Sequence, residues 1–156
     1  MKFVVDASAC AKFWVRETGS RKARELLASG EADNDLIVPW HMPAETISVF
    51  IKTRLKKNGV VQGLRAETIK RYTDDLMELV RDDILRVVDV NMPKAVELAS
   101  LDTGGQGHLS IYDTIYHALA IQEDAKFVTD DAAYVRKLQN HARLRTSVVL
   151  LENLEL

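Results

Sequence analysis

The sequence is poor in several residue types, and each shortage excludes a class of protein. A single cysteine, Cys10, cannot form a disulfide within the chain, so a reducing, cytoplasmic location is expected. No stretch approaches the ~18 consecutive apolar residues of a membrane-spanning helix. Residues 1–20 do not resemble a signal peptide, because charged side chains interrupt a short apolar run. We therefore expect a cytoplasmic protein without membrane contact.

Proline and glycine are scarce as well, at three and seven residues, and no segment resembles a linker or an internal repeat. With 156 residues we expect one domain over 1–156, since a domain typically has about 150 residues. The chain also lacks a charge excess. A net charge of −2 neither indicates nor excludes a nucleic-acid partner, because a metal-dependent nuclease can combine an acidic centre with basic surroundings.

What the sequence does contain is a regular alternation of short apolar runs and amphipathic segments. The runs predict strands at 2–5, 36–39, 84–88, 126–129 and 146–150. The segments predict helices from Ala7 to near Thr18 and at 21–28, 44–57, 64–81, 92–101, 111–122 and 132–140. Strands separated by helices indicate an α/β fold, namely a three-layer α/β/α sandwich around a parallel sheet of about five strands.

Four acidic residues, far apart in the chain, are predicted to lie at one edge of that sheet. Asp6 and Asp131 follow predicted strands, whereas Glu45 and Asp113 lie in the first turns of predicted helices. Crossover helices run antiparallel to the strands, so helix N-termini and strand C-termini share the edge where open α/β sheets bind ligands. The distances between the four acids stay open, because the order of the strands does not follow from their spacing.

If these carboxylates converge, they need a compensating charge, because like charges in one site raise each other's pKa. Oxygen ligands without a nearby histidine or cysteine suit Mg²⁺ or Mn²⁺. Such an ion meets its substrate through phosphate oxygens, and the chemistry that follows is phosphodiester hydrolysis. Ser8 and Thr129 are candidates to hold the carboxylates or metal-bound waters by hydrogen bonds.

Any one of these acids alone is more often a cap or turn residue than a ligand. Asp113 differs, because it lies within the nearly continuous apolar helix 111–121, where an unpartnered acid is costly. Glu45 is likewise followed by an apolar run, 47–51, which would bury its surroundings. These two positions favour a functional site over simple capping.

Four blocks of the sequence resemble the PIN-domain family, and in particular the VapC-like toxins of type II toxin–antitoxin pairs. The opening strand and its D-x-S ending, residues 3–9, resemble the first block, and Val38-Pro39 with Glu45 resembles the second. Residues 109–120 resemble the third, in which an Asp opens an alanine-rich helix, and residues 127–131 resemble the fourth, a strand ending in T-x-D. The blocks occur in the family's order and span almost the whole chain.

The resemblance implies a Mg²⁺-dependent endoribonuclease with Asp6, Glu45, Asp113 and Asp131 as catalytic and metal-binding residues. It also implies a homodimer and a cognate antitoxin that inhibits the toxin. In the fourth block, Asp130 occupies a place where the family usually has a small residue, so Asp130 is kept as an alternative to Asp131.

Basic residues near the predicted site are candidates for contacts with the RNA backbone. Lys12 and Arg16 are on or beside the first predicted helix, and Lys52 is on the helix that begins near Glu45. For Lys52, a cationic helix C-terminus that complements the helix dipole is the simpler explanation.

Two other functions remain open. The first is another carboxylate-centred α/β protein, either a phosphohydrolase such as a phosphoaspartate phosphatase or a receiver domain. A phosphatase would need a second acid where Ser8 stands, and a receiver domain needs an acidic pair and a lysine after a late strand, but no predicted strand ends in lysine. The second is a catalytically silent PIN-like module that only binds RNA or a partner, and the presence of all four acids argues against it.

Overall fold

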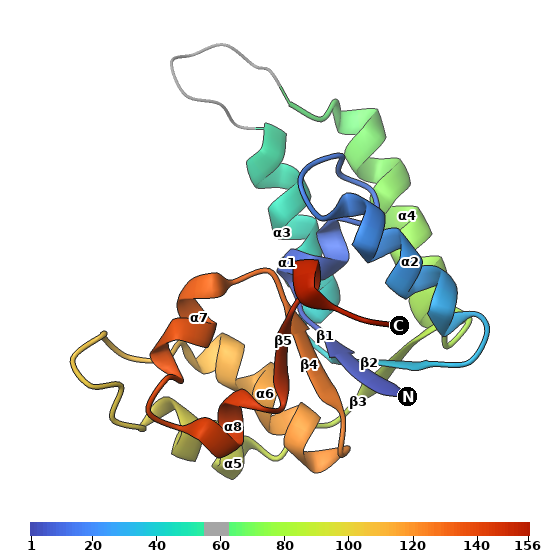
Figure 1. The fold of residues 1–156 in the computed structure, drawn as a ribbon. Helices are drawn as coiled ribbons and strands as arrows, with labels where there is room; N and C mark the ends of the chain where they lie inside the picture. The colour runs from blue at the N-terminus through green and yellow to red at the C-terminus, as the bar shows by residue number, and fades with distance from the viewer. Residues whose placement is uncertain (55–62) are drawn as a thin grey trace.

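A parallel sheet forms the centre of the computed structural model, which describes residues 1–54 and 63–156 (Figure 1). Its strands lie in the spatial order β3-β2-β1-β4-β5, and each neighbouring pair is parallel. The strands are β1 (Lys2–Val5), β2 (Asp35–Pro39), β3 (Leu85–Val88), β4 (Lys126–Thr129) and β5 (Val148–Leu150). The predicted α/β/α sandwich with a parallel sheet of about five strands is confirmed.

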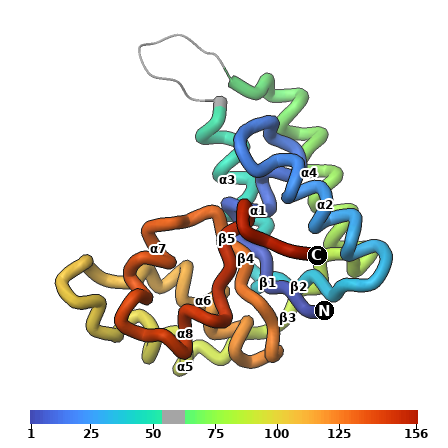
Figure 2. The backbone as a smooth tube through the Cα atoms, in the orientation of Figure 1, coloured from blue at the N-terminus to red at the C-terminus, as the bar shows by residue number. Residues whose placement is uncertain are grey.

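Helices cover both faces of the sheet. In the described residues they are α1 (Ala7–Ala11), α2 (Ser20–Gly30), α3 (Met42–Arg54), α4 (Ala66–Arg81), α5 (Met92–Ala99), α6 (Ile111–Gln122), α7 (Ala132–Lys137) and α8 (Ala142–Arg145). The backbone trace in Figure 2 shows α2 and α4 on one side of the sheet and α5 to α8 on the other. This separation follows from right-handed crossovers, because the chain moves across the sheet in one direction from β1 to β3 and in the opposite direction from β3 to β5.

The strand order places a topological switch point between β1 and β4. From β1 the chain moves outward to β2 and β3, and it then returns to β4 on the other side of β1 before reaching β5. The register pairs Val5 with Val128, so Asp6 and Thr129 emerge side by side. Ligands of open α/β sheets bind at such a reversal.

The core packs on both faces of the sheet, and on one face it is formed largely by α6. Residues 114–120 of this helix are all buried, which explains why its sequence is apolar nearly all round. The Tyr116 ring stacks on Phe127 of β4 with the ring planes 1° apart and the centroids 5.9 Å apart. This helix therefore fixes the position of Asp113 relative to β4.

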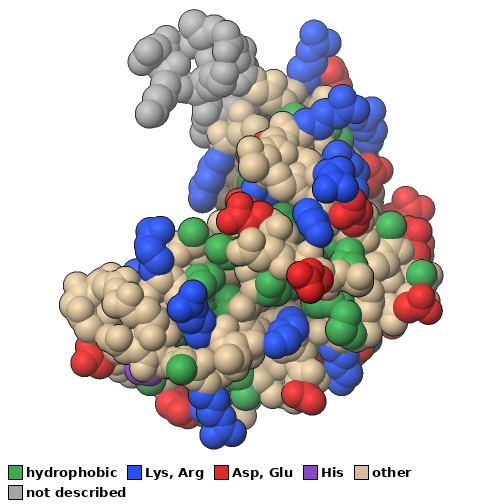
Figure 3. Space-filling model, in the orientation of Figure 1, with side chains coloured by type: hydrophobic (Ala, Val, Ile, Leu, Met, Phe, Trp, Pro, Cys, Tyr) green, Lys and Arg blue, Asp and Glu red, His purple; other side chains and the backbone are tan. Residues whose placement is uncertain are grey.

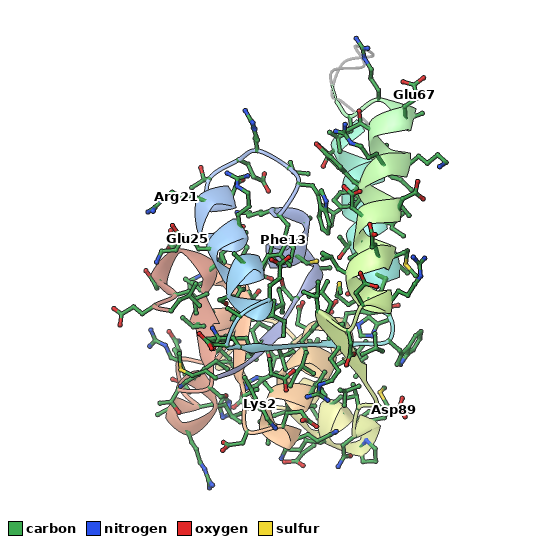
Figure 4. All side chains as sticks on the ribbon, turned by 90° about the vertical axis from the view of Figure 1, so that its right-hand side faces the viewer. Lys2, Phe13, Arg21, Glu25, Glu67 and Asp89 are labelled. Atoms are coloured by element: carbon green, nitrogen blue, oxygen red, sulfur yellow. The ribbon has the colours of Figure 1, made fainter. Side chains whose placement is uncertain are left out.

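A second cluster joins α3 and α4, which pack side by side (Figure 4). Trp14 packs edge-on against Phe50 of α3 with the centroids 5.6 Å apart, and it contacts Tyr72 of α4 at 6.3 Å. The neighbouring Phe13 points into the interior in Figure 4, whereas Arg21 and Glu25 pair on the outer surface of α2.

Several helix ends differ from the sequence prediction. The helix expected from Ala7 to near Thr18 ends at Ala11, because the amides of Lys12 and Phe13 donate to carbonyls three residues back, as in a turn. Gly19, which directly precedes α2, adopts a left-handed φ of 89°. The helix expected over 132–140 ends at Lys137, and α8 precedes β5, so the last strand is shorter than expected. The predicted end of α3 at Lys57 lies outside the described residues.

His117 is a buried histidine that supports the core. Its two ring nitrogens lie 2.8 Å from the hydroxyl of Tyr134 and 2.8 Å from that of Ser147. Burial lowers the pKa of His117 from 6.5 to about 4. The folded protein therefore holds this ring neutral at pH values where the unfolded chain protonates it.

We expect His117 to make folding pH-dependent between about 6.5 and about 4. Its contribution to the free energy of unfolding is complete above pH 6.5 and is lost as the pH falls to about 4, by about 3 kcal/mol at most. Urea unfolding of the wild type and of His117→Gln over this pH range measures the effect. The stability difference between the two proteins should shrink as the pH falls, and parallel pH profiles would contradict the assignment.

Candidate active site

A cleft of about 250 Å³ opens at the switch point of the sheet. It is lined by Asp6, Ala7, Ser8, Glu45, Ser48, Val49, Lys52, Asp113, Tyr116 and Asp131. In the space-filling view the surface is notched between the arm made by α3 and α4 and the lobe around α7, with charged side chains on the rim (Figure 3). The structure therefore brings all four predicted acids into one cleft.

Asp6 is the most enclosed of the four carboxylates. Its Oδ1 accepts hydrogen bonds from the Ser8 hydroxyl and the Ala9 amide, both at 2.7 Å, and its Oδ2 accepts one from the Thr129 hydroxyl. Burial raises the pKa of Asp6 to about 6, although these hydrogen bonds act to lower it. Asp6 also caps the N-terminus of α1, so the same hydrogen bonds start the helix and orient the carboxylate.

Glu45 enters the cleft from the first turn of α3. The Tyr116 hydroxyl, on α6, donates a hydrogen bond of 2.6 Å to its Oε2. Burial and the neighbouring Glu45 charge raise the pKa of Tyr116 well above its usual value, so this hydroxyl remains a donor. The contact ties α3 to α6 across the end of the sheet.

Asp113 projects from the first turn of α6, whose N-terminus is capped by Ser110. Burial, together with the charges of Asp131, Asp6 and Glu45, raises the pKa of Asp113 to about 6, whereas the charge of Lys137 acts to lower it. The four carboxylates therefore repel one another in this cleft.

Asp131 and Asp130 have different surroundings. Asp131 lines the cleft, and its Oδ1 accepts hydrogen bonds from the amides of Ala133 and Tyr134 at the start of α7. Asp130 points to Lys12 instead, with 2.5 Å between its Oδ2 and the ammonium nitrogen. Of the two alternatives, the structure thus places Asp131 beside the other three acids.

The three basic residues expected near RNA have distinct positions. Lys52 lines the cleft and is exposed, and Arg16 is exposed in the loop after α1. Lys12, in contrast, keeps only 8% of its side chain exposed and also donates to the Thr18 carbonyl at 2.6 Å. The interpretation of Lys12 as an RNA contact is corrected here: its ammonium is occupied within the protein, where it orders the segment around Asp130.

Sequence reasoning missed two residues of the site. Tyr116 lies three positions after Asp113, on the same side of α6, a spacing that could have identified it. His41 lies four positions before Glu45, with its Nε2 3.5 Å from Glu45 Oε2, and burial lowers its pKa. Both were hidden because an aromatic ring in an apolar segment usually belongs to the core.

The donor set of the cleft fits a hard divalent cation. Four carboxylates and the hydroxyl of Ser8 offer only oxygen, which Mg²⁺ and Mn²⁺ prefer. In residues 1–54 and 63–156, no three Asp, Glu, His or Cys side chains are gathered closely enough to form a complete metal site. Three of the carboxylates, those of Asp6, Glu45 and Asp131, each accept hydrogen bonds from the protein.

Residues 3–140 match the sequence model of the PIN domain. The chain belongs to the PIN-domain family. This match covers every one of the four acids and, from Phe3 of β1 onward, the strands β1 to β4, and it ends before α8 and β5.

Two solved structures resemble this PIN domain along nearly its whole length. PAE2754 from Pyrobaculum aerophilum has a TM-score of 0.62 at 17% identity, covering 97% of this chain and 90% of that one. VapBC2 from Rickettsia felis, bound to a DNA fragment from the promoter, has a TM-score of 0.55 at 16% identity, covering 96% and 97%. At these identities the likeness shows the fold. A comparison with curated protein sequences finds no match.

The Lys12–Asp130 pair of this PIN domain generates an asymmetric prediction. Asp130→Ala should lower the free energy of unfolding by about 1–3 kcal/mol, because it leaves a buried ammonium without its carboxylate. Lys12→Met should cost less than about 1 kcal/mol, since it keeps the apolar stem and leaves Asp130 in contact with water. Urea unfolding at pH 7 compares the variants, and a larger loss for Lys12→Met would refute this account.

Proposed function

We propose that this PIN domain is a Mg²⁺-dependent endoribonuclease that hydrolyses RNA phosphodiester bonds and acts as the toxin of a toxin–antitoxin pair. The observation that carries the proposal is the single cleft lined by Asp6, Glu45, Asp113 and Asp131. The chain also belongs to a family whose members are generally nucleases. An acidic cleft of this kind needs a cation before it can accept a phosphodiester, because phosphate and carboxylate repel each other.

Asp6, Glu45, Asp113 and Asp131 would hold Mg²⁺ or Mn²⁺, which when bound supplies a Lewis acid and an activated water for attack on phosphorus. The remaining work falls to the protein. Ser8 and Thr129 fix the rotamer of Asp6, and Tyr116 fixes that of Glu45. Such support from neighbouring side chains typically matters 10- to 100-fold for metal affinity or activity.

Lys52 is the basic side chain best placed to attract RNA. It is exposed and lines the same cleft as the four carboxylates. Lys52 lies in the last turn of α3 and Glu45 in the first, so the two residues are roughly 10 Å apart along the helix axis. Contact with a backbone phosphate there would place the adjoining phosphodiester over the acids.

The toxin role, an antitoxin partner, a homodimer and a cytoplasmic location belong to the proposal as well. They rest on the family and on the fold shared with VapBC2, which was crystallised on promoter DNA. Among the described residues, no helix has the length and apolarity to cross a bilayer.

The two rival functions are less well supported by the geometry. A phosphoaspartate phosphatase needs a free acid two residues after Asp6, but Ser8 stands there and its hydroxyl donates to Asp6. A silent binding module would have no need to keep four acids in one cleft at the cost of the repulsion that acts on Asp113. Metal-dependent cleavage of RNA by the purified protein would argue against both of these functions.

We expect cleavage of RNA by the purified protein with Mg²⁺ or Mn²⁺ and none with a chelator. Asp6→Asn and Asp113→Asn should each reduce the rate by on the order of 10³-fold, because the cation contributes several kcal/mol of transition-state stabilisation. A gel assay on single-stranded and structured RNA measures the rates. Asp74→Asn is the matched control, since Asp74 is an exposed acid of α4 paired with Lys70.

Cleavage that survives the chelator, or rates in Asp6→Asn and Asp113→Asn that equal the wild-type rate, would refute the mechanism. Metal-dependent binding without cleavage of any RNA would favour the silent module.

Thr129→Val tests the support of Asp6. Valine keeps the shape of threonine but removes the hydroxyl that donates to Asp6 Oδ2. We expect activity at limiting Mg²⁺ to fall about 10- to 100-fold, with partial recovery at high Mg²⁺, because the carboxylate is less well oriented and harder to ionise. Activity titrated against Mg²⁺ gives the apparent metal affinity, and an unchanged titration would show that Thr129 is dispensable.

A further inference from the structure

Two aromatic side chains stand out by their exposure. The chain has four Phe, four Tyr and two Trp. Of these, only Trp40 and Tyr112 are exposed, at 66% and 57%, and all ten aromatic residues lie in the described part of the chain. Large exposed rings cost solubility, so their position on the surface calls for an explanation.

Both rings lie close to residues that line the acidic cleft, although neither ring lines it. Tyr112 directly precedes Asp113 at the start of α6, and Trp40 follows β2 shortly before Glu45. The ring of His41 lies between them, with centroids 5.4 Å from Trp40 and 6.0 Å from Tyr112. On its other side His41 packs at 5.2 Å against Tyr116, the residue that holds Glu45. The exposed rings are thus connected to the catalytic carboxylates through packed aromatic groups.

The buried side chain of His41 is expected to destabilise the fold. Its side chain is only 8% exposed, and its Nε2 lies 3.5 Å from Glu45 Oε2, but neither ring nitrogen has a hydrogen-bond partner among the described residues. A buried polar group without a hydrogen bond typically destabilises a fold by about 1–3 kcal/mol. A histidine at this position is therefore better explained by the packing of its ring against Trp40, Tyr112 and Tyr116 than by hydrogen bonding.

We propose that Trp40, His41 and Tyr112 form a stacking platform for an unpaired nucleobase next to the phosphodiester in the cleft. The inference rests on the proposed nuclease function and narrows its substrate to single-stranded or loop RNA. Every base presents a π face to such rings, but bases inside a duplex are stacked on each other and are not accessible. Lys52, which lines the cleft, would then contact the backbone while the platform holds a base.

The competing occupant is a second copy of this chain, since exposed aromatic rings also occur at protein interfaces. The packing of the platform onto Tyr116 and Glu45 favours the nucleobase. A base on these rings would be separated by one aromatic ring, that of His41, from Tyr116, which lines the cleft where the phosphodiester is proposed to react.

Trp40 provides a direct readout, because the only other tryptophan is Trp14. Trp14→Phe leaves Trp40 as the only tryptophan, and Asp113→Asn in the same protein prevents cleavage of the probe during the measurement. The probes, with Mg²⁺ present, are an unstructured 12-nucleotide RNA, the same strand in a duplex, and an abasic ribose-phosphate 12-mer. We expect the single strand to quench Trp40 emission and the other two probes to leave it nearly unchanged.

Binding of the single strand should weaken about 5- to 100-fold in Trp40→Ala and in Tyr112→Ala, measured by anisotropy of a labelled RNA. Trp40→Phe should retain most of the affinity, because it keeps a ring. Ile121→Ala is the matched control, since Ile121 is exposed at the opposite end of α6.

Equal quenching by the duplex and abasic probes, or unchanged affinity in the alanine variants, would overturn the platform. The platform would also be overturned if Trp40 emission depended on protein concentration but not on RNA, and if Trp40→Ala dissociated a dimer. These two results would show that a second copy of the chain covers the rings. These outcomes are separable from a failure of the nuclease proposal. Wild-type cleavage with a silent Trp40 removes only the platform, whereas base-dependent quenching without wild-type cleavage supports the platform in a binding module.

Discussion

The hydrogen bonds around the Asp6 carboxylate join the fold to the site. Ser8 and the Ala9 amide lie on α1, and Thr129 ends β4, so one buried carboxylate connects the central strand, its helix and the neighbouring strand. The Asp130 amide in turn donates to Ser8, and the Asp131 amide to Thr129. Six residues at or just after the ends of two strands thereby form one network. Loss of a donor would shift Asp6 and the start of α7 together.

Much of the fold could be predicted because local signals agreed with tertiary structure. Buried strands such as 126–129 are short and β-branched, and Ser110 and Asp131 cap helices where the sequence suggested helix starts. The order of the strands could not be predicted, because it depends on which faces the crossovers cover. That order decides whether Asp6 and Asp131 are neighbours, so the convergence of the acids needed the structure.

The misplaced residues share a physical cause. Lys12 was expected at the surface because lysine seldom lies inside, but Asp130 and the Thr18 carbonyl compensate its burial. Tyr116 looked like a core residue and is one, yet its hydroxyl reaches Glu45. A side chain with an apolar body and a polar tip can serve the core and the site at once, and residue type alone does not distinguish these roles.

The unfavourable features of the molecule gather at one edge of the sheet. The pKa values of Asp6 and Asp113 are raised from 3.8 to about 6 in the folded protein. The free energy of unfolding therefore decreases as the pH rises from 3.8 through about 6. His41 lacks hydrogen-bond partners within the described residues, and Trp40 and Tyr112 expose their rings beside it. His117, buried far from solvent in the same helix as Asp113, has both ring nitrogens partnered. Two histidines in one fold thus differ in how well their surroundings satisfy them. The poorly satisfied one lies beside the carboxylates, as expected where local stability is exchanged for binding.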